Sequence, residues 1–444
     1  MSVVELPRSA RIWGTVTGTD GTSIRLGGLA RLAKLGDRVE VDTGGERIAA
    51  EIVAIDGLDM TALLMAAPRG LSAGQRAWLV PDPDPNPSDR WLGQVLDAYG
   101  RTGDGAPNAI MARTDAKRSA PDPGGMRRPL GPRLTTGLAA LDTFLPLCRG
   151  QRLGVFAGSG VGKSRLMADL ALGIMADVVV IGLIGERSRE VGDFVRLLTQ
   201  AGGMDRTVVI AASSDQPALY KRRAAALTLK TAEHFRDQGR HVLCLLDSVT
   251  RYAEAHREIA LAAGEAPALR AFPPSTTPMI ADLCERAGPG VAGDAGGDIT
   301  AVFTVLVAGS DMDEPVADMV RGVLDGHVIL DRAIAERGRF PAIDMRKSVS
   351  RSAPAAWTAD EEALVMHARR LIAAREEAAP MIQAGLYAPG ADPVLDDAVR
   401  LWPDLDGFVG SITRGQSSTE NFARLAEILA QSEDGAASGA PRAN

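Results

Sequence analysis

The chain has 444 residues, of which 45% are hydrophobic and 24% are charged, and its formal net charge at pH 7 is −7. This length predicts two or three domains, and the acidic balance weighs against nucleic acid or an anionic membrane as the main partner, since both bind basic surfaces. The sequence has no apolar signal segment, no run of 18 apolar residues and no metal-ligand or disulfide spacing among its three cysteines, so we expect a cytoplasmic protein.

The first part of the chain contains short apolar segments separated by Gly and Asp turns. Five of them have strand character, over residues 11–16, 23–27, 38–43, 46–55 and 60–66. This rhythm is typical of a small closed barrel or a sandwich. We predict an N-terminal β-barrel domain over residues 1–82.

The middle of the chain, residues 83–350, is predicted to form a second domain that includes a Pro/Gly-rich segment over residues 101–133. Five nearly continuous apolar segments alternate there with helical ones, over residues 152–157, 177–185, 207–212, 241–247 and 300–309. Such segments suit parallel strands that are buried on both faces, so the expected fold class is α/β with a mostly parallel sheet. The basic run 221–223 opens one of the helices and is expected to face solvent.

The last part, residues 351–444, is predicted to be a C-terminal helical domain with a disordered tail over residues 434–444. Thr358 and Glu361 have capping-box spacing at the start of one helix. Asp392 before Pro393 predicts the start of a second helix. Ser417-x-x-Glu420 predicts the start of a third.

The stretch AGSGVGKS, residues 157–164, joins a predicted strand to a predicted helix. This context and the closing Gly-Lys-Ser are typical of a phosphate-binding loop, although Ala157 stands where the general pattern has glycine. Backbone N–H groups from Gly158 to Gly162 can surround phosphates, and the helix N-terminus adds a favourable field for anions. We expect Lys163 to hold the β- and γ-phosphates of a nucleotide and Ser164 to ligate Mg²⁺.

Two acidic residues end other predicted strands. Asp247 closes the strand LCLLD, a usual position for the acid that holds Mg²⁺ through water. Glu186 closes VVVIGLIGE and can polarise the attacking water as a general base. Taken alone, Asp247 could merely cap a turn and Glu186 could be a solvated strand end. Together with the phosphate loop they favour a nucleotide hydrolase.

The amino-acid sequence resembles those of the rotary F1/V1-type ATPases, and within them it is most similar to the flagellar protein-export and type III secretion ATPases. The phrases that carry the resemblance are, in order, WLGQVLDAYGRTGDG, FAGSGVGKS, GERSRE, LLDSVTRYA, GEAPALRAFPPS, DITAVFTVLVAGSDMDEPVAD, LDGHVILDR, GRFPAIDMRKSVSR and IQAGLYAPGADPVLDDAVRLWP. Alanine at the start of the phosphate loop is that family's own variant. The similarity covers nearly the whole chain and implies a RecA-like P-loop core.

The resemblance also implies which residues bind ATP and Mg²⁺. The nucleotide-binding set is Gly158, Ser159, Gly160, Val161, Gly162, Lys163, Ser164 and Arg165. Ser164 and Asp247 match the residues that hold Mg²⁺. Phe340, in GRFPAID, matches an aromatic residue that stacks on adenine, although a core residue before Pro341 would have the same pattern.

Four residues match catalytic positions. Lys163 and Arg187 would contact the γ-phosphate, and Glu186 would activate water. Arg351, at the end of SVSR, matches an arginine finger that is donated to the neighbouring subunit's site. An ordinary basic surface near Arg346 is the alternative for Arg351.

The family forms homohexamers with active sites between subunits. The resemblance implies four further partners: a stator-like tether, a coiled-coil stalk protein, the export gate and chaperone–substrate complexes. The protein would then be peripheral to the inner membrane through those partners. Two segments differ from the family's pattern: the glycine-rich residues 288–298, and the N-terminus, which is short for binding a tether.

The sequence predicts an ATPase that energises protein export through the flagellar type III secretion apparatus and unloads substrates from chaperones. The virulence (injectisome) type III secretion ATPase shares all these motifs and stays open as an alternative. An RNA translocase like the termination factor Rho is disfavoured, because residues 1–90 hold 10 Lys+Arg against 12 Asp+Glu and only two aromatic residues, Trp13 and Trp78. Glu186 argues against a non-catalytic ring subunit.

Overall fold

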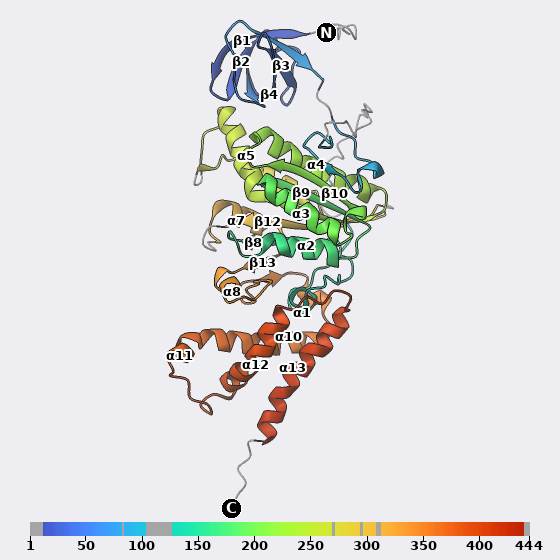
Figure 1. The fold of residues 1–444 in the computed structure, drawn as a ribbon, viewed down its shortest axis with the longest axis vertical. Coiled ribbons are helices and arrows are strands. Elements are labelled where there is room, and N and C mark those ends of the chain that lie inside the picture. The colour runs from blue at the N-terminus through green and yellow to red at the C-terminus, as the bar shows by residue number, and fades with distance from the viewer. Residues whose placement is uncertain are drawn as a thin grey trace, which may run out of the picture.

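The structure is a computed structural model that describes residues 12–81, 84–103, 127–268, 271–293, 296–307 and 312–438. Figure 1 shows three parts stacked along the long axis: a β-barrel near the N-terminus, an α/β body in the middle and a helical part that leads to the C-terminus. The phosphate loop lies in the middle part.

The barrel closes, within the described residues, through six antiparallel strands in the order β1-β2-β5-β4-β3-β6. Their bounds are β1 Trp13–Asp20, β2 Ser23–Gly27, β3 Arg38–Asp42, β4 Arg47–Asp56, β5 Asp59–Leu64 and β6 Arg76–Val80. The sequence pattern predicts the first five strands but not β6, whose residues RAWLV have no clear polar–apolar alternation. This strand closes the barrel by pairing with both β1 and β3.

The middle part is built on an eight-stranded sheet, within the described residues, with the order β14-β13-β8-β12-β11-β9-β10-β7. The strands are β7 Val95–Leu96, β8 Arg152–Ala157, β9 Val178–Glu186, β10 Thr207–Ser213, β11 His241–Asp247, β12 Asp298–Leu306, β13 Gly326–Leu330 and β14 Val349–Ser350. Neighbours are parallel except β13 and β14. The expected mostly parallel α/β core is therefore confirmed.

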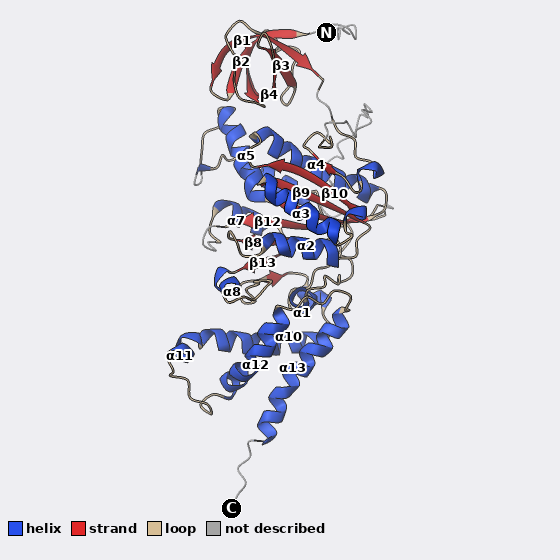
Figure 2. Cartoon of the chain, in the orientation of Figure 1, coloured by secondary structure: helices blue, strands red, loops and turns tan. Residues whose placement is uncertain are grey.

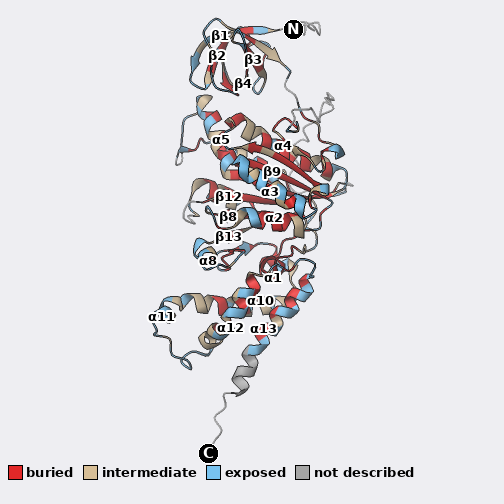
Figure 3. Ribbon diagram, in the orientation of Figure 1, coloured by how far each residue is buried: buried red, intermediate tan, exposed pale blue. Residues whose placement is uncertain are grey.

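Helices cover both faces of this sheet (Figure 2). On β11, Val242, Cys244 and Leu246 pack toward one face, and Leu243 and Leu245 toward the other. The first face is covered by α4 Ala218–Asp237, α5 Val249–Ala262, α6 Thr276–Glu285 and α7 Pro315–Val323. The second face is covered by α2 Lys163–Gly173 and α3 Ser188–Gln200. Buried residues concentrate on the strands between these layers (Figure 3).

The C-terminal part consists of α10 Ala359–Glu377, α11 Ala379–Gln383, α12 Pro393–Val409 and α13 Ser418–Ser438. Helices α10, α12 and α13 share a core with α1 Ala139–Thr143, whereas α11 has no buried residue. Thr358 forms the predicted capping box with Glu361, and the Asp392 side chain caps α12. Helix α13 continues to Ser438, where the sequence predicted disorder, and residues 439–444 lie outside the described residues. None of the helices among the described residues has the length and apolarity to cross a lipid bilayer.

The remaining short elements are the helices α8 Arg332–Glu336 and α9 Ala353–Ala356 and the 3-10 turns η1 Asp89–Trp91 and η2 Met204–Arg206.

The barrel is joined to the α/β body by ion pairs between one buried carboxylate and two partly buried arginines. Glu51 of β4 is 5% exposed, and its carboxylate accepts hydrogen bonds from Arg222 at 2.5 Å and Arg223 at 3.4 Å. Arg223 also lies over the ring of Tyr99, 4.8 Å from its centroid. The prediction that this basic run faces solvent was wrong for both arginines, because their partner lies in another part of the chain.

Candidate active site

The phosphate loop follows a central strand of the sheet. β8 ends at Ala157, whose side chain is fully buried, and α2 begins at Lys163. Gly160 and Gly162 adopt φ values of +78° and +90°, which side chains rarely tolerate. Because the first turn of a helix leaves its N–H groups without intrahelical partners, this loop presents donors to an anion.

The two acidic strand ends meet at Lys163. Its Nζ donates to Glu186 Oε1 at 2.9 Å and also contacts Asp247 Oδ1. β8, β11 and β9 are parallel members of one sheet, so their carboxyl ends lie at the same edge. Thr304 of β12 donates to Asp247 Oδ1 at 2.6 Å. Thr304 was not among the predicted site residues, because a single threonine in an apolar strand has no recognisable pattern.

The charge cluster formed by Lys163, Glu186 and Asp247 is largely buried. The side chains of Lys163, Glu186 and Asp247 are 10%, 15% and 4% exposed. Burial raises the pKa of Asp247, and the Lys163 ammonium opposes that shift. Burial alone would lower the pKa of Lys163, but the carboxylates of Asp247 and Glu186 outweigh it and raise that pKa. The lysine is therefore held as a cation.

A small hollow opens beside this cluster. It is lined by Ser164, Leu183, Glu186, Glu190, Val191, Phe194 and Asp247. Ser164 is exposed. Its hydroxyl and the carboxylates that line the same pocket offer oxygen atoms, which are the ligands that Mg²⁺ prefers. With the phosphate-binding donors of the loop alongside, the residues fit a Mg²⁺–nucleotide. Glu190 was not among the predicted site residues.

Phe340 lies against the phosphate loop. Its side chain is 47% exposed, and a Cβ placed on Gly162 would come within 3.0 Å of Phe340 Cδ1. The half-exposed ring therefore touches the loop, which disfavours the alternative of a core residue. Glycine at 162 is needed both for its positive φ and for this close approach.

The two arginines predicted near the nucleotide, Arg187 and Arg165, are largely exposed. Arg187 follows Glu186 directly and is 82% exposed, with an ion pair to Glu190 at 3.6 Å. Arg165 is 59% exposed and donates to Asp169 at 3.2 Å. The structure joins neither arginine to the Lys163 cluster through a hydrogen bond or ion pair among the described residues.

Arg351 lies far from the chain's own phosphate loop. It is exposed, and its backbone N–H donates to the carbonyl of Asp325 at 2.9 Å. Asp325 is beside Arg152, the first residue of β8, whereas the loop begins after Ala157 at the strand's other end. Five residues of strand span about 16 Å. Arg351 therefore lies near the amino end of β8, and the phosphate loop lies at the carboxyl end of this strand.

Comparison with protein families gives two matches. Residues 137–350 match the nucleotide-binding domain of the ATP synthase alpha/beta family. Residues 357–431 match the C-terminal domain of the type III secretion ATPase EscN.

Individual relatives match over nearly the whole length. The flagellum-specific ATP synthase of Caulobacter vibrioides is 43% identical over 443 residues, which are 98% of this chain and 99% of the relative. The type 3 secretion system ATPase of Xanthomonas euvesicatoria is 43% identical over 75% of each chain. The assembled ATPase EscN of enteropathogenic E. coli superposes with a TM-score of 0.83 at 35% identity, covering 94% of this chain and 100% of EscN. A second structure, of EscN with its central stalk EscO, gives 0.81 at 34% identity over the same shares of the two chains.

Proposed function

This chain belongs to the family of flagellar and type III secretion ATPases, and we propose that it works in a flagellar export apparatus as a homohexameric ring that unloads substrates from chaperones. The full-length identity to a flagellar relative supports the flagellar assignment. The virulence assignment remains the second candidate, since the similar solved structures are of EscN.

In the proposed mechanism the phosphate loop binds ATP through the backbone from Gly158 to Gly162 and through Lys163. Ser164 and Asp247 are the residues that would hold Mg²⁺. When bound, Mg²⁺ neutralises the charge that develops on the phosphates. Phe340 stacks on adenine.

Glu186 is proposed to take the proton of the attacking water. A general base must be held in place next to the reacting water, and the Lys163 ammonium holds the Glu186 carboxylate through a hydrogen bond of 2.9 Å. Once phosphates bind, Lys163 has new anions to contact, which leaves Glu186 free to accept a proton. Arg187, one residue further on, completes the γ-phosphate side of the site.

The observation that carries the ring proposal is the position of Arg351. A residue about 16 Å along the strand direction from its own phosphate loop cannot contact a γ-phosphate there. In a ring of identical subunits each head-to-tail interface brings one edge of a subunit against a different edge of its neighbour. Arg351 then acts in the neighbour's site, where such a finger contributes about 10³–10⁵ in rate.

The proposed partners follow from the same family. The EscN–EscO complex supports a coiled-coil stalk protein in the pore of the ring. A stator-like tether, the export gate and chaperone–substrate complexes are proposed with it. The protein is then cytoplasmic and peripheral to the inner membrane through these partners. The N-terminal residues 1–11, which are short for binding a tether, lie outside the described residues.

The proposal is tested by measuring ATP turnover per molecule against protein concentration, without RNA or partner proteins. A rate that climbs with concentration supports sites that are completed between subunits. If turnover is absent under these conditions and appears when RNA is added in a second series, a nucleic-acid translocase is favoured and the export assignment is rejected. A constant rate from particles shown by light scattering to be monomeric would reject the ring.

A further inference from the structure

The structure must hold the predicted arginine finger with very little regular backbone. β14 has only two residues, and its ladder with β13 consists of the pairs Gly326–Ser350 and His327–Val349. The backbone N–H of Arg351 adds one bond to Asp325. A strand this short at the edge of a sheet is weakly fixed by its own hydrogen bonds.

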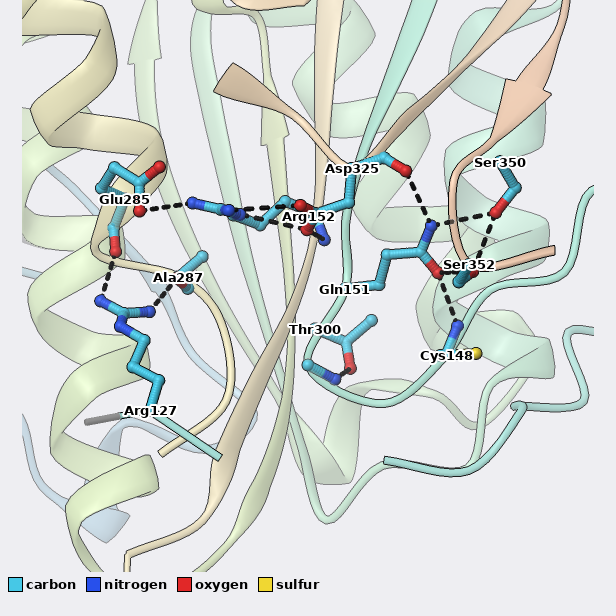
Figure 4. A network of polar contacts seen from close by, with 11 residues as sticks. Arg127, Cys148, Gln151, Arg152, Glu285, Ala287, Thr300, Asp325, Ser350 and Ser352 are labelled. Atoms are coloured by element: carbon cyan, nitrogen blue, oxygen red, sulfur yellow. Dashed lines mark hydrogen bonds and ion pairs between the residues drawn. The ribbon is translucent and has the colours of Figure 1, made fainter. Parts of the chain in front are cut away.

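The buried side-chain amide of Gln151 forms hydrogen bonds with the residues on both sides of Arg351. Gln151 is 0% exposed and precedes β8. Its Nε2 donates to Ser350 Oγ at 3.1 Å, and its Oε1 accepts from Ser352 Oγ at 2.8 Å (Figure 4). The residues before and after Arg351 are thus both fixed by hydrogen bonds to the Gln151 side chain.

The same amide is itself fixed by the backbone around it. Oε1 also accepts from the N–H of Cys148 at 2.8 Å, and Nε2 also approaches the carbonyl of Asp325 at 3.4 Å. Two donors and two acceptor positions are the full capacity of a glutamine side chain. Ser350 in turn donates to the carbonyl of Pro146 at 2.7 Å. These bonds leave the amide little freedom to rotate.

Arg152, the residue after Gln151, also stabilises the position of the Arg351 backbone, through Asp325. The guanidinium of Arg152 pairs with the carboxylate of Asp325 at 3.2 Å and with Glu285 at 2.6 Å (Figure 4). Asp325 is the residue whose carbonyl accepts from Arg351 N–H. Gln151 and Arg152 therefore hold the finger from adjacent positions at the start of the strand that carries the phosphate loop.

Packing alone does not require a glutamine here. A buried amide costs free energy unless every polar atom finds a partner, and an apolar side chain of similar volume fills the same space. What the amide adds is direction, because its bonds fix where Ser350 and Ser352, and hence Arg351, lie. We infer that Gln151 is a positioning residue that orients the arginine finger toward the neighbouring subunit's nucleotide; this inference rests on the proposed function of Arg351.

The test is a double-mutant cycle of Gln151→Met and Arg351→Ala, measured in the full-length chain. Gln151→Met keeps the volume and removes the directed bonds. We expect its kcat to fall about 100-fold, the usual effect of displacing a catalytic group by about 1 Å, with ATP affinity unchanged within about two-fold. In the Arg351→Ala background the same substitution should change kcat by less than about two-fold, because the group it positions is gone.

Asn421→Leu is the matched control. Asn421 is also a fully buried amide, bonded to Asp142 and Thr413 at 3.1 Å, but it lies in α13. Both substitutions remove buried hydrogen bonds and should lower the melting temperature, but Asn421→Leu should leave kcat per ring unchanged. If Gln151→Met does not fold, Ser352→Ala removes only the hydroxyl that donates to Gln151. The kcat of this variant should fall about ten-fold, and this loss should disappear in the Arg351→Ala background.

Three outcomes overturn the inference and can be told apart. If Gln151→Met lowers kcat equally in both backgrounds, the glutamine acts through general packing. If it leaves kcat unchanged while Arg351→Ala abolishes turnover, the finger is held by other contacts and the proposed function stands. If Arg351→Ala itself retains full turnover, the finger assignment in the proposed function fails too.

Discussion

Replacing Lys163 with methionine probes the charge cluster without any nucleotide. The substitution keeps the length of the side chain and removes the ammonium that lies between Glu186 and Asp247. Two carboxylates then face each other in a site where Asp247 is 4% exposed. Breaking a buried ion pair by removing one partner costs about 3–5 kcal/mol. We expect the low end, about 3 kcal/mol, because the already raised pKa of Asp247 lets that carboxyl take up a proton.

The assay is thermal unfolding at pH 7 followed by circular dichroism. For a domain of 150–250 residues, about 3 kcal/mol lowers the melting temperature by roughly 6–12 °C. The double variant Lys163→Met/Asp247→Asn should recover most of this loss, since it removes the uncompensated charge. Equal melting temperatures for wild type and Lys163→Met, or a further loss in the double variant, would refute the described cluster.

The pH dependence of that deficit has a definite sign. Without Lys163, the pKa of Asp247 rises further above its unfolded value, so the folded variant binds a proton that the unfolded chain does not. Its stability therefore increases relative to wild type as the pH falls from 7 toward 5. The deficit should shrink in that direction.

Three further substitutions test other parts of the site and its surroundings. Glu186→Gln should keep ATP binding and lower turnover by about 10²–10⁴; full turnover would reject the general base. Phe340→Ala should weaken ATP binding about ten-fold, measured by titration, since stacking on one base contributes about 1–3 kcal/mol. Asp298→Asn should cost about 1–2 kcal/mol near pH 7, because this carboxylate accepts from Arg149, Arg128 and the Gly290 N–H, and these bonds outweigh burial to lower its pKa. That contribution is present above the ordinary aspartate pKa and is lost as the pH falls through the lower folded value, so the two proteins should converge in acid.

The parts of the molecule that could be predicted are those whose pattern lies within one continuous segment of the chain. The phosphate loop needs only the order strand, loop and helix, and the strands that end in Glu186 and Asp247 are apolar enough to be recognised singly. Their meeting at Lys163 follows from parallel order, because strand ends at one edge converge.

What the sequence could not supply are contacts between distant segments. Gln151 pairs with Ser350 and Ser352, about two hundred positions away, and a single glutamine has no recognisable pattern. Arg222 looked like a solvated cation because its partner Glu51 belongs to the barrel. The end of the glycine-rich segment, residues 296–298, is likewise held from a distance, since Arg128 donates to the carbonyl of Gly297 and to the carboxylate of Asp298.

The central claim, that each active site is shared by two subunits, is tested most directly by mixing two inactive proteins. Glu186→Gln keeps its finger and Arg351→Ala keeps its base, and each alone should turn over about 10² or more times slower than wild type. In a 1:1 mixture of exchanging rings, half of the sites keep Glu186 and half of those face an intact Arg351, so turnover should return to about a quarter of the wild-type rate. A mixture that stays as inactive as its components would contradict the account, because sites completed within one subunit gain nothing from their neighbours.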